Sequence, residues 1–204
     1  DGRVLGVPGT IDNDLYGTDW TIGFFTALDT AMEAIDRIRD TAEAFDRIFL
    51  LEVMGRASGW IGLMTGIAGG AEAMILPERP MDMTALAEDI RAAKERGKGS
   101  YLVVVSEGIN GGVDAVAREV ARRTGFDTRS CVLGHLQRGG SPKALDRYLG
   151  TRFGVKAVEA AADGAHNVMV GQAGGRDVRI PLPETFSTEK PIDLELLAMN
   201  RPLT

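Results

Sequence analysis

The stretch VLGVPGTIDND, residues 4–14, joins a short apolar run to a cluster of carboxyl and amide side chains. Residues 4–7 are predicted to form a buried β-strand, because a short apolar run bounded by Pro and Gly is typical of one. Pro, Gly, Asn and Asp are also ordinary turn residues whose side chains cap backbone amides. Alternatively, Asp12 and Asp14 at the carboxyl end of a strand can divide chemical work, one accepting a proton and the other organising a cation or charged substrate. The stretch alone leaves both interpretations open.

Outward from this stretch, apolar runs alternate with amphipathic stretches. The predicted strands are 4–7, 48–53, 73–76, 101–105, 130–133 and 168–170, and the predicted helices are 21–39, 60–68, 84–94, 113–123 and 143–162. This alternation predicts an α/β fold with mostly parallel sheets and helices on both faces. The first helix is long for one crossover, so we expect the chain to step there from one sheet to another. The tail after Gly174 is predicted to hold an edge strand, irregular structure and a short helix near Leu194–Met199.

The composition restricts the classes of protein to which the chain can belong. With 204 residues, 44% hydrophobic and 25% charged, it suits one globular domain or two small lobes. The chain lacks a run of about 18 apolar residues, which excludes a transmembrane helix, and it does not open with a secretory signal. The net charge of −6 argues against broad nucleic-acid binding, and a single cysteine, Cys131, agrees with a reducing cytoplasm. Because the chain starts at Asp1, almost directly on a strand, we expect it to be a piece of a longer protein.

Polar side chains follow four of the predicted strands, each at the carboxyl end, where open parallel sheets bind ligands. The residues at these positions, with the glycines and the methionine among them, are Asp12, Asp14, Met54, Gly55, Arg56, Glu107, His135, Arg138, Gly139 and Gly140. Glycines let backbone amides approach an anion, and arginines bind phosphate. Taken singly, Glu107 is also consistent with a turn acid and His135 with a hydrogen-bonded wall residue. Together they predict a site for a phosphate-bearing substrate, with an acid placed for proton abstraction.

Arg47 and Arg129 differ from this set because both precede their predicted strands. They therefore stand at the amino-terminal edge of the sheet, away from the crevice of their own subunit. Ordinary surface charge is one interpretation. If they act on a substrate, we expect them to serve a neighbouring subunit.

Five ordered motifs resemble the 6-phosphofructokinase family, and closely its short bacterial ATP-dependent type. They are PGTIDND (8–14), GTDWTIGFFTAL (17–28), EVMGR (52–56), VSEG (105–108) and VLGHLQRGGSP (132–142). The resemblance runs from residue 4 to about residue 160. It implies two lobes: residues 1–24 end the nucleotide-binding lobe, 25–137 form the fructose-6-phosphate and effector lobe, 138–186 return to the nucleotide lobe, and 187–204 form a C-terminal tail.

The resemblance also implies roles for the residues of these motifs. Asp12 would take the proton from the 1-hydroxyl of fructose 6-phosphate, while Asp14 would support the catalytic loop and the charge of metal and phosphates. His135 and Arg138 would hold the 6-phosphate, and Glu107 would bind a sugar hydroxyl. The implied catalytic residues are Asp12, Thr10, Asp14 and Arg56. The implied substrate-binding residues are Thr10, Ile11, Asp12, Arg47, Met54, Gly55, Arg56, Glu107, Arg129, His135, Leu136, Gln137 and Arg138.

Partners and regulation follow from the same resemblance. ATP and Mg²⁺ would bind mainly in an N-terminal half that precedes this stretch in the family, so the chain alone is expected to be inactive. Arg47 and Arg129 correspond to arginines lent across a subunit interface, which implies a homo-oligomer, a tetramer in the family. An allosteric site for ADP or phosphoenolpyruvate would involve Arg39, Gly70, Glu72, Arg96 and Lys98. Residues 95–100 are also what a helix end looks like, with basic residues before a glycine.

The sequence leaves two alternatives to a cytoplasmic, glycolytic, ATP-dependent 6-phosphofructokinase. One is a pyrophosphate-dependent phosphofructotransferase. Gly9 argues against it, because pyrophosphate-using relatives carry a lysine at this position. The other is a non-catalytic module that binds a sugar phosphate or an effector, against which the missing initial Met argues.

Overall fold

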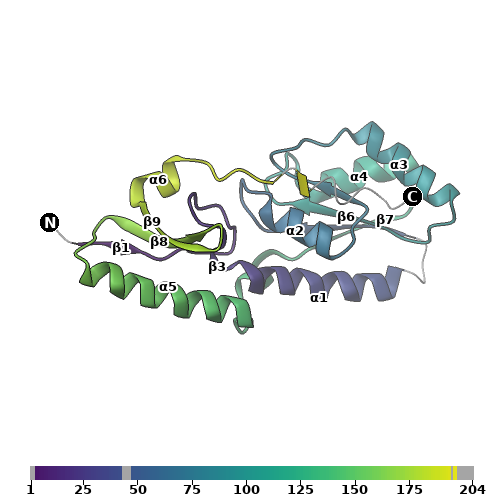
Figure 1. The fold of residues 1–204 in the computed structure, drawn as a ribbon. Coiled ribbons are helices and arrows are strands. Elements are labelled where there is room, and N and C mark those ends of the chain that lie inside the picture. The colour runs from purple at the N-terminus through teal and green to yellow at the C-terminus, as the bar shows by residue number, and fades with distance from the viewer. Residues whose placement is uncertain (1–2, 43–46, 194, 197–204) are drawn as a thin grey trace. The chain divides into compact units, whose positions relative to one another are not determined.

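The computed structural model describes residues 3–42, 47–193 and 195–196. Its elements are β1 (Leu5–Gly6), β2 (Gly9–Thr10), β3 (Ile22–Gly23), α1 (Phe24–Ala42), β4 (Ile48–Val53), α2 (Trp60–Ala68), β5 (Ala73–Ile75), α3 (Met83–Glu95), β6 (Tyr101–Ser106), α4 (Gly112–Thr124), β7 (Thr128–Val132), the 3₁₀ helix η1 (Gly134–Arg138), α5 (Ala144–Ala162), β8 (Val168–Ala173), β9 (Arg176–Pro181) and α6 (Leu182–Ser187) (Figure 1). The chain divides into two compact units. Unit 1 comprises residues 1–27 and 140–191, and unit 2 comprises residues 28–139 and 192–204.

Unit 2 is built on a four-stranded parallel sheet in the order β5-β6-β4-β7. Side chains alternate across a strand, so Ile48 and Leu50 of β4 pack with α3 and α4, while Leu51 and Val53 lie on the opposite face. Helix α2 covers that opposite face, where its Gly62 approaches the side chain of Ser106. Helices thus cover both faces (Figure 1), which explains why β4 and β6 are nearly continuous apolar runs.

Unit 1 holds a three-stranded sheet in the order β1-β8-β9 and a short parallel pair, β2-β3. Strands β1 and β8 are parallel, whereas β8 and β9 form an antiparallel hairpin. Helix α5 packs against these strands through Leu149 and Phe153, which are buried with Val170.

A buried carboxylate joins α5 to the start of α1 within unit 1. Asp146, in the first turn of α5, is 2% exposed. Its Oδ1 accepts from the Gly23 amide at 2.8 Å, and its Oδ2 accepts from the amide and hydroxyl of Thr26 at 2.7 and 2.5 Å. Asp146 therefore satisfies amides at the amino terminus of α1, where a helix has no partners of its own.

Much of the predicted secondary structure is confirmed. The α/β class is confirmed, and among the described strands only the β8–β9 pair is antiparallel. Helix α2 and strand β4 have the predicted bounds, and the 19-residue α1 leads from the sheet of β3 to the sheet of β4. Strand β9 is the predicted edge strand.

Other boundaries differ from the prediction. Helix α1 begins at Phe24 rather than residue 21, because Ile22 and Gly23 pair with β2 instead. Strands β2 and β3 and helix α6 were not predicted, since elements this short carry no periodicity. The helix expected near Leu194–Met199 falls mostly outside the described residues. In the part of the chain that the structure describes, none of the helices has the length and apolar character to cross a membrane.

Candidate functional site

The turn after β4 carries Met54, Gly55 and Arg56 in an unusual backbone conformation. Gly55 has φ +147°, and Arg56 has φ +53°, a left-handed value that is uncommon for a non-glycine residue. A Cβ atom on Gly55 would lie 2.3 Å from the carbonyl oxygen of Ser58, so this position requires glycine. Strained backbone of this kind is held by its surroundings and gathers at functional sites.

Glu107, after the neighbouring strand β6, braces this turn. Its Oε1 accepts from the Gly55 amide at 3.1 Å and from the Arg56 amide at 2.8 Å. A carboxylate that accepts two backbone amides fixes both, and the exposed Arg56 side chain then starts from a fixed backbone. Glu107 is thus more than the ordinary turn acid that its position before Gly108 also allowed.

The segment after β7 forms η1, which carries His135, Leu136, Gln137 and Arg138. Gln137 is 1% exposed, and its Oε1 accepts from the Met54 amide at 2.7 Å. The bond ties η1 to the turn after β4. His135, Leu136 and Arg138 are exposed, so one buried amide side chain holds a segment whose other side chains are available to a ligand.

Because β4 lies between β6 and β7 in a parallel sheet, these three segments meet at one edge of unit 2. The edge presents the cations Arg56 and Arg138 together with His135, over a framework of side-chain hydrogen bonds to backbone amides. Such an arrangement suits a phosphate or another compact anion.

Gly108 gives this edge a testable weak point. It has φ +86°, and a Cβ atom there would lie 2.7 Å from the carbonyl oxygen of Arg56. We expect Gly108→Ala to displace Arg56 and to destabilise the fold by about 1–3 kcal/mol. Calorimetry checks the stability, with Gly99→Ala as control, because a Cβ at Gly99 meets nothing within 4 Å. Equal thermal midpoints for the two variants would contradict the expectation.

The other predicted catalytic residues belong to unit 1. Thr10 ends β2, and its carbonyl accepts from the hydroxyl of Thr21 at 2.7 Å. The Thr10 hydroxyl accepts from the amide of Asp12 at 3.1 Å. Asp12 is 6% exposed, whereas Asp14 is exposed. Ile11 packs against Gly23 of β3, which anchors the start of this loop.

Asn13, between the two acids, was missed by the sequence reasoning. It is fully buried with φ +52°, and its Nδ2 donates to the carbonyl oxygen of Asp19 at 3.2 Å. Asparagine tolerates left-handed backbone better than most residues. This tolerance, together with the place of Asn13 between two acids, was the one feature of the sequence that could have pointed to its role. Asn13 turns the backbone so that a buried acid and an exposed acid flank it.

Arg47 and Arg129 lie together at the opposite edge of the unit 2 sheet. Arg47 precedes β4, and its Nε donates to Asp127 Oδ2 at 2.7 Å; Arg129 contacts the same carboxylate at 3.2–3.3 Å. The prediction that Arg129 precedes its strand is wrong, since β7 begins at Thr128, which pairs with Ile48. Arg129 is nevertheless the second residue of β7, at the end of the strand away from η1.

Three of the predicted effector residues line one small cavity in unit 2. Glu72, Arg96 and Lys98 surround it with Asp89 and Tyr101, and its volume is about 180 Å³. Lys98 pairs with Glu72 at 2.6 Å, and burial raises the pKa of the Tyr101 hydroxyl well above its ordinary value. The other two predicted positions, Arg39 and Gly70, contact each other. The Arg39 guanidinium donates to the carbonyl oxygens of Gly69 and Gly70.

Comparison with known proteins identifies relatives over the whole chain. A model of the phosphofructokinase family matches residues 2–161. The chain is 52% identical over 201 residues to ATP-dependent 6-phosphofructokinase 1 of Thermus thermophilus, covering 98% of this chain and 62% of that protein. The phosphofructokinase structure from Saccharomyces cerevisiae superposes with a TM-score of 0.84 at 36% identity, covering 89% of this chain and 26% of that one. A pyrophosphate-dependent phosphofructokinase structure from Marinobacter aquaeolei gives 0.80 at 30% identity, covering 95% and 55%. The chain therefore spans less than two thirds of the length of these relatives.

Proposed function

This chain belongs to the phosphofructokinase family, and from that premise we propose that its protein transfers the γ-phosphate of ATP to the 1-hydroxyl of fructose 6-phosphate. The observation that carries the proposal is the edge of unit 2, where Glu107 holds the backbone of Arg56 and the buried Gln137 holds η1 by hydrogen bonds. The edge is cationic and built for one compact anion, which suits the 6-phosphate of the sugar.

In the proposed mechanism each group has a distinct task. Arg138 and His135 bind the 6-phosphate. The second carboxylate oxygen of Glu107 accepts a hydrogen bond from a sugar hydroxyl. Asp12 accepts the proton of the 1-hydroxyl as that oxygen attacks, and Asp14 supports the loop. Phosphoryl transfer depends on in-line positioning and on neutralising charge, so one acid and several cations suffice from the side of the sugar.

The donor is proposed to be ATP with Mg²⁺. Within residues 3–42, 47–193 and 195–196, no group of three or more His, Cys, Asp or Glu side chains is arranged to hold a metal ion. Mg²⁺ is usually held by one or two carboxylates together with the phosphates of the substrate, so the roles above are assigned to the chain's own side chains alone. Gly9 is exposed at the start of β2 and offers no ammonium to a pyrophosphate, which favours ATP over the pyrophosphate-dependent alternative.

A direct assay tests the activity. The full-length protein, with fructose 6-phosphate and either ATP–Mg²⁺ or pyrophosphate–Mg²⁺, is expected to form fructose 1,6-bisphosphate with ATP alone. Product formed only with pyrophosphate would establish the alternative phosphofructotransferase. A protein that binds fructose 6-phosphate but transfers phosphate from neither donor would be a non-catalytic module.

We further propose that the enzyme is a cytoplasmic, glycolytic homotetramer regulated by ADP or phosphoenolpyruvate at the cavity lined by Glu72, Arg96 and Lys98. Arg47 and Arg129 would act on the sugar phosphate of a neighbouring subunit. Their placement supports this, because Arg47 precedes β4, whose six residues span about 17–20 Å, beyond the reach of an arginine. Arg129 lies beside Arg47 on the same Asp127 carboxylate, near the amino-terminal end of β7.

Subunit mixing tests the shared site. Asp12→Asn subunits keep the arginines and lack the base, whereas Arg129→Ala subunits keep the base and lack an arginine. Mixed oligomers are expected to recover activity well above the sum of the two parents, because some sites then combine intact groups. If mixed oligomers form and activity stays at that sum, each arginine serves its own chain.

A further inference from the structure

Lys190 lies in the segment after α6 and reaches back to the loop that carries Asp12. The residue is half-buried, and its Nζ donates to the carbonyl oxygen of Asp19 at 2.8 Å. Both residues belong to unit 1, although 171 positions separate them in the chain. A long, charged side chain withdrawn from water normally has a partner that compensates for its desolvation.

The carbonyl oxygen that Lys190 contacts is the one that orients Asn13. Asn13 Nδ2 donates to it at 3.2 Å, while Asn13 Oδ1 is buried without a hydrogen-bond partner among the described residues. The Asn13 side chain is therefore oriented through the Asp19 carbonyl. Because Asn13 adopts left-handed backbone next to Asp12, the position of that carbonyl affects where the Asp12 carboxylate points.

The charge of Lys190 also matters to the loop. The carboxylates of Asp19 and Asp14 both lie close enough to favour its ammonium form, yet burial outweighs them and lowers the pKa of Lys190 to about 8. Near pH 7 the ammonium is thus retained next to two carboxylates. A cation there balances negative charge in a loop that holds three aspartates within eight residues.

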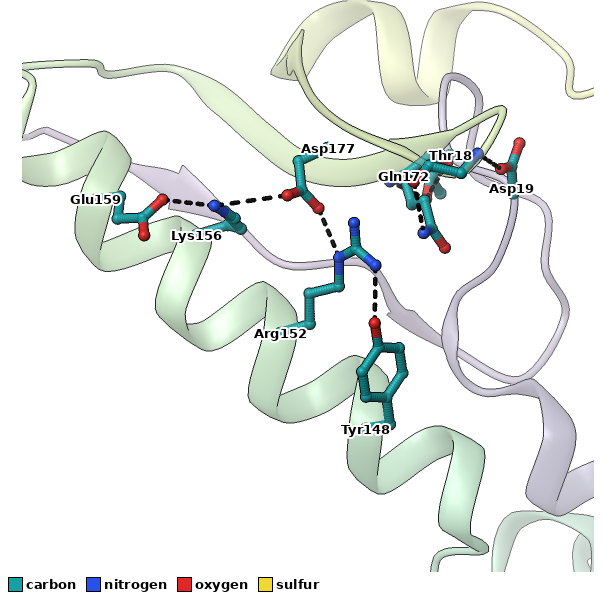
Figure 2. Close-up of polar contacts among 9 residues, drawn as sticks. Thr18, Asp19, Tyr148, Arg152, Lys156, Glu159, Gln172 and Asp177 are labelled. Carbon is teal, nitrogen blue, oxygen red and sulfur yellow. Dashed lines mark hydrogen bonds and ion pairs between the residues drawn. The ribbon is translucent and has the colours of Figure 1, made fainter.

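Backbone contacts from the C-terminal part of unit 1 complete the support. The Asp19 amide donates to the carbonyl oxygen of Gln172 at 2.5 Å, and the Gln172 amide donates to the Thr18 hydroxyl at 3.1 Å. Figure 2 shows Thr18 and Asp19 beside Gln172 of β8. The β8–β9 hairpin therefore fixes the end of the loop, and Lys190 adds a side-chain contact to the same residue.

We propose that Lys190 is a positioning residue, which holds the Asp19 carbonyl and through Asn13 sets the orientation of Asp12. The inference rests on the proposed role of Asp12 as the general base. Lys190 lies outside the span that the family model matches, which ends at residue 161.

Lys190→Met in the full-length protein tests the proposal, because it keeps the length of the side chain and removes the donor and the charge. We expect kcat to fall at least about tenfold, since small misplacements of a catalytic group have large effects, while KM for fructose 6-phosphate changes less than about threefold. Amide exchange of residues 12–19 should become faster. Lys156→Met is the matched control: Lys156 is a lysine of unit 1 paired with Glu159 and Asp177 on α5 and β9 (Figure 2).

The outcomes separate the inference from the proposed function. Unchanged kcat and unchanged amide exchange in Lys190→Met would overturn the inference even if the wild-type enzyme phosphorylates fructose 6-phosphate. A wild-type protein without that activity would refute the proposed function, and amide exchange would still decide whether Lys190 holds the loop. A purely structural lysine would lower kcat only in parallel with thermal stability.

Lys190→Arg decides the question if Lys190→Met does not fold. Arginine keeps its charge at high pH, whereas Lys190 loses its proton as the pH rises through about 8 and then donates more weakly. The kcat of the wild type should therefore decline above pH 8 more steeply than that of Lys190→Arg. Identical pH profiles for the two proteins would overturn the proposal.

Discussion

Asp12→Asn in the full-length protein is expected to lower kcat by at least about 10²-fold, the lower range for loss of a general base. Asparagine keeps the shape of the side chain and cannot accept the proton of the sugar 1-hydroxyl. The surroundings favour a clean test, because Asp12 is 6% exposed and its amide is held by the Thr10 hydroxyl. That contact of the Asp12 amide does not involve the carboxylate that the substitution changes.

The affinity for fructose 6-phosphate should change little, since Arg138 and His135 of unit 2 are proposed to supply the contacts with phosphate. Steady-state kinetics and isothermal titration with the sugar phosphate separate the two quantities. Asp163→Asn is the control, because Asp163 is a carboxylate of unit 1 whose ion pair, with Arg179, lies outside the loop. Near-normal kcat in Asp12→Asn would refute its assignment as the base.

Asp146→Ala is expected to destabilise the protein by about 3 kcal/mol, the upper range for leaving buried donors without a charged acceptor. The substitution removes the acceptor of the Gly23 amide and of both donors of Thr26. For a chain of this size that corresponds to a fall in Tm of roughly 6–12 °C. Asp146→Asn should also destabilise, because its amide group would face an N–H donor.

Differential scanning calorimetry measures this effect. Asp36→Ala, an exposed aspartate on α1, is the control and is expected to shift Tm by less than about 2 °C. Because Gly23 ends β3 and pairs with Thr10 of β2, the Asp146 variant should also show faster amide exchange in the loop after Thr10. A Tm equal to that of the control would show that Asp146 is dispensable.

The sequence allowed the α/β class, strand β4, helix α2 and the convergence of polar groups in unit 2 to be predicted. Those features follow from local periodicity and from the rule that parallel strands present their carboxyl ends together. Glu107 and Arg56 were found because each lies within three residues of the carboxyl end of a strongly apolar strand. The roles of these residues toward a substrate remain predictions.

The supporting residues could not be predicted in the same way. Asp146 resembles any acid in the first turn of a helix, and its partners Gly23 and Thr26 lie 120 and more positions earlier. Lys190 sits in a polar tail without periodicity. Their importance comes from long-range contacts with backbone groups, and a backbone amide or carbonyl has no signature in the sequence.

The pairing of β1 with β8 has a consequence for how the protein is made. The strands of unit 2 span residues 48–132, so its sheet can assemble while the ribosome is still adding later residues. Leu5 instead cannot pair until Val168 has been synthesised. The loop that carries Asp12 lacks its contacts until Gln172 and Lys190 have been added. At bacterial and eukaryotic elongation rates that interval is roughly ten to thirty seconds. The loop that carries Asp12 would thus reach its final contacts only after the strands of unit 2 have been synthesised, and β1 lacks its partner β8 throughout that time.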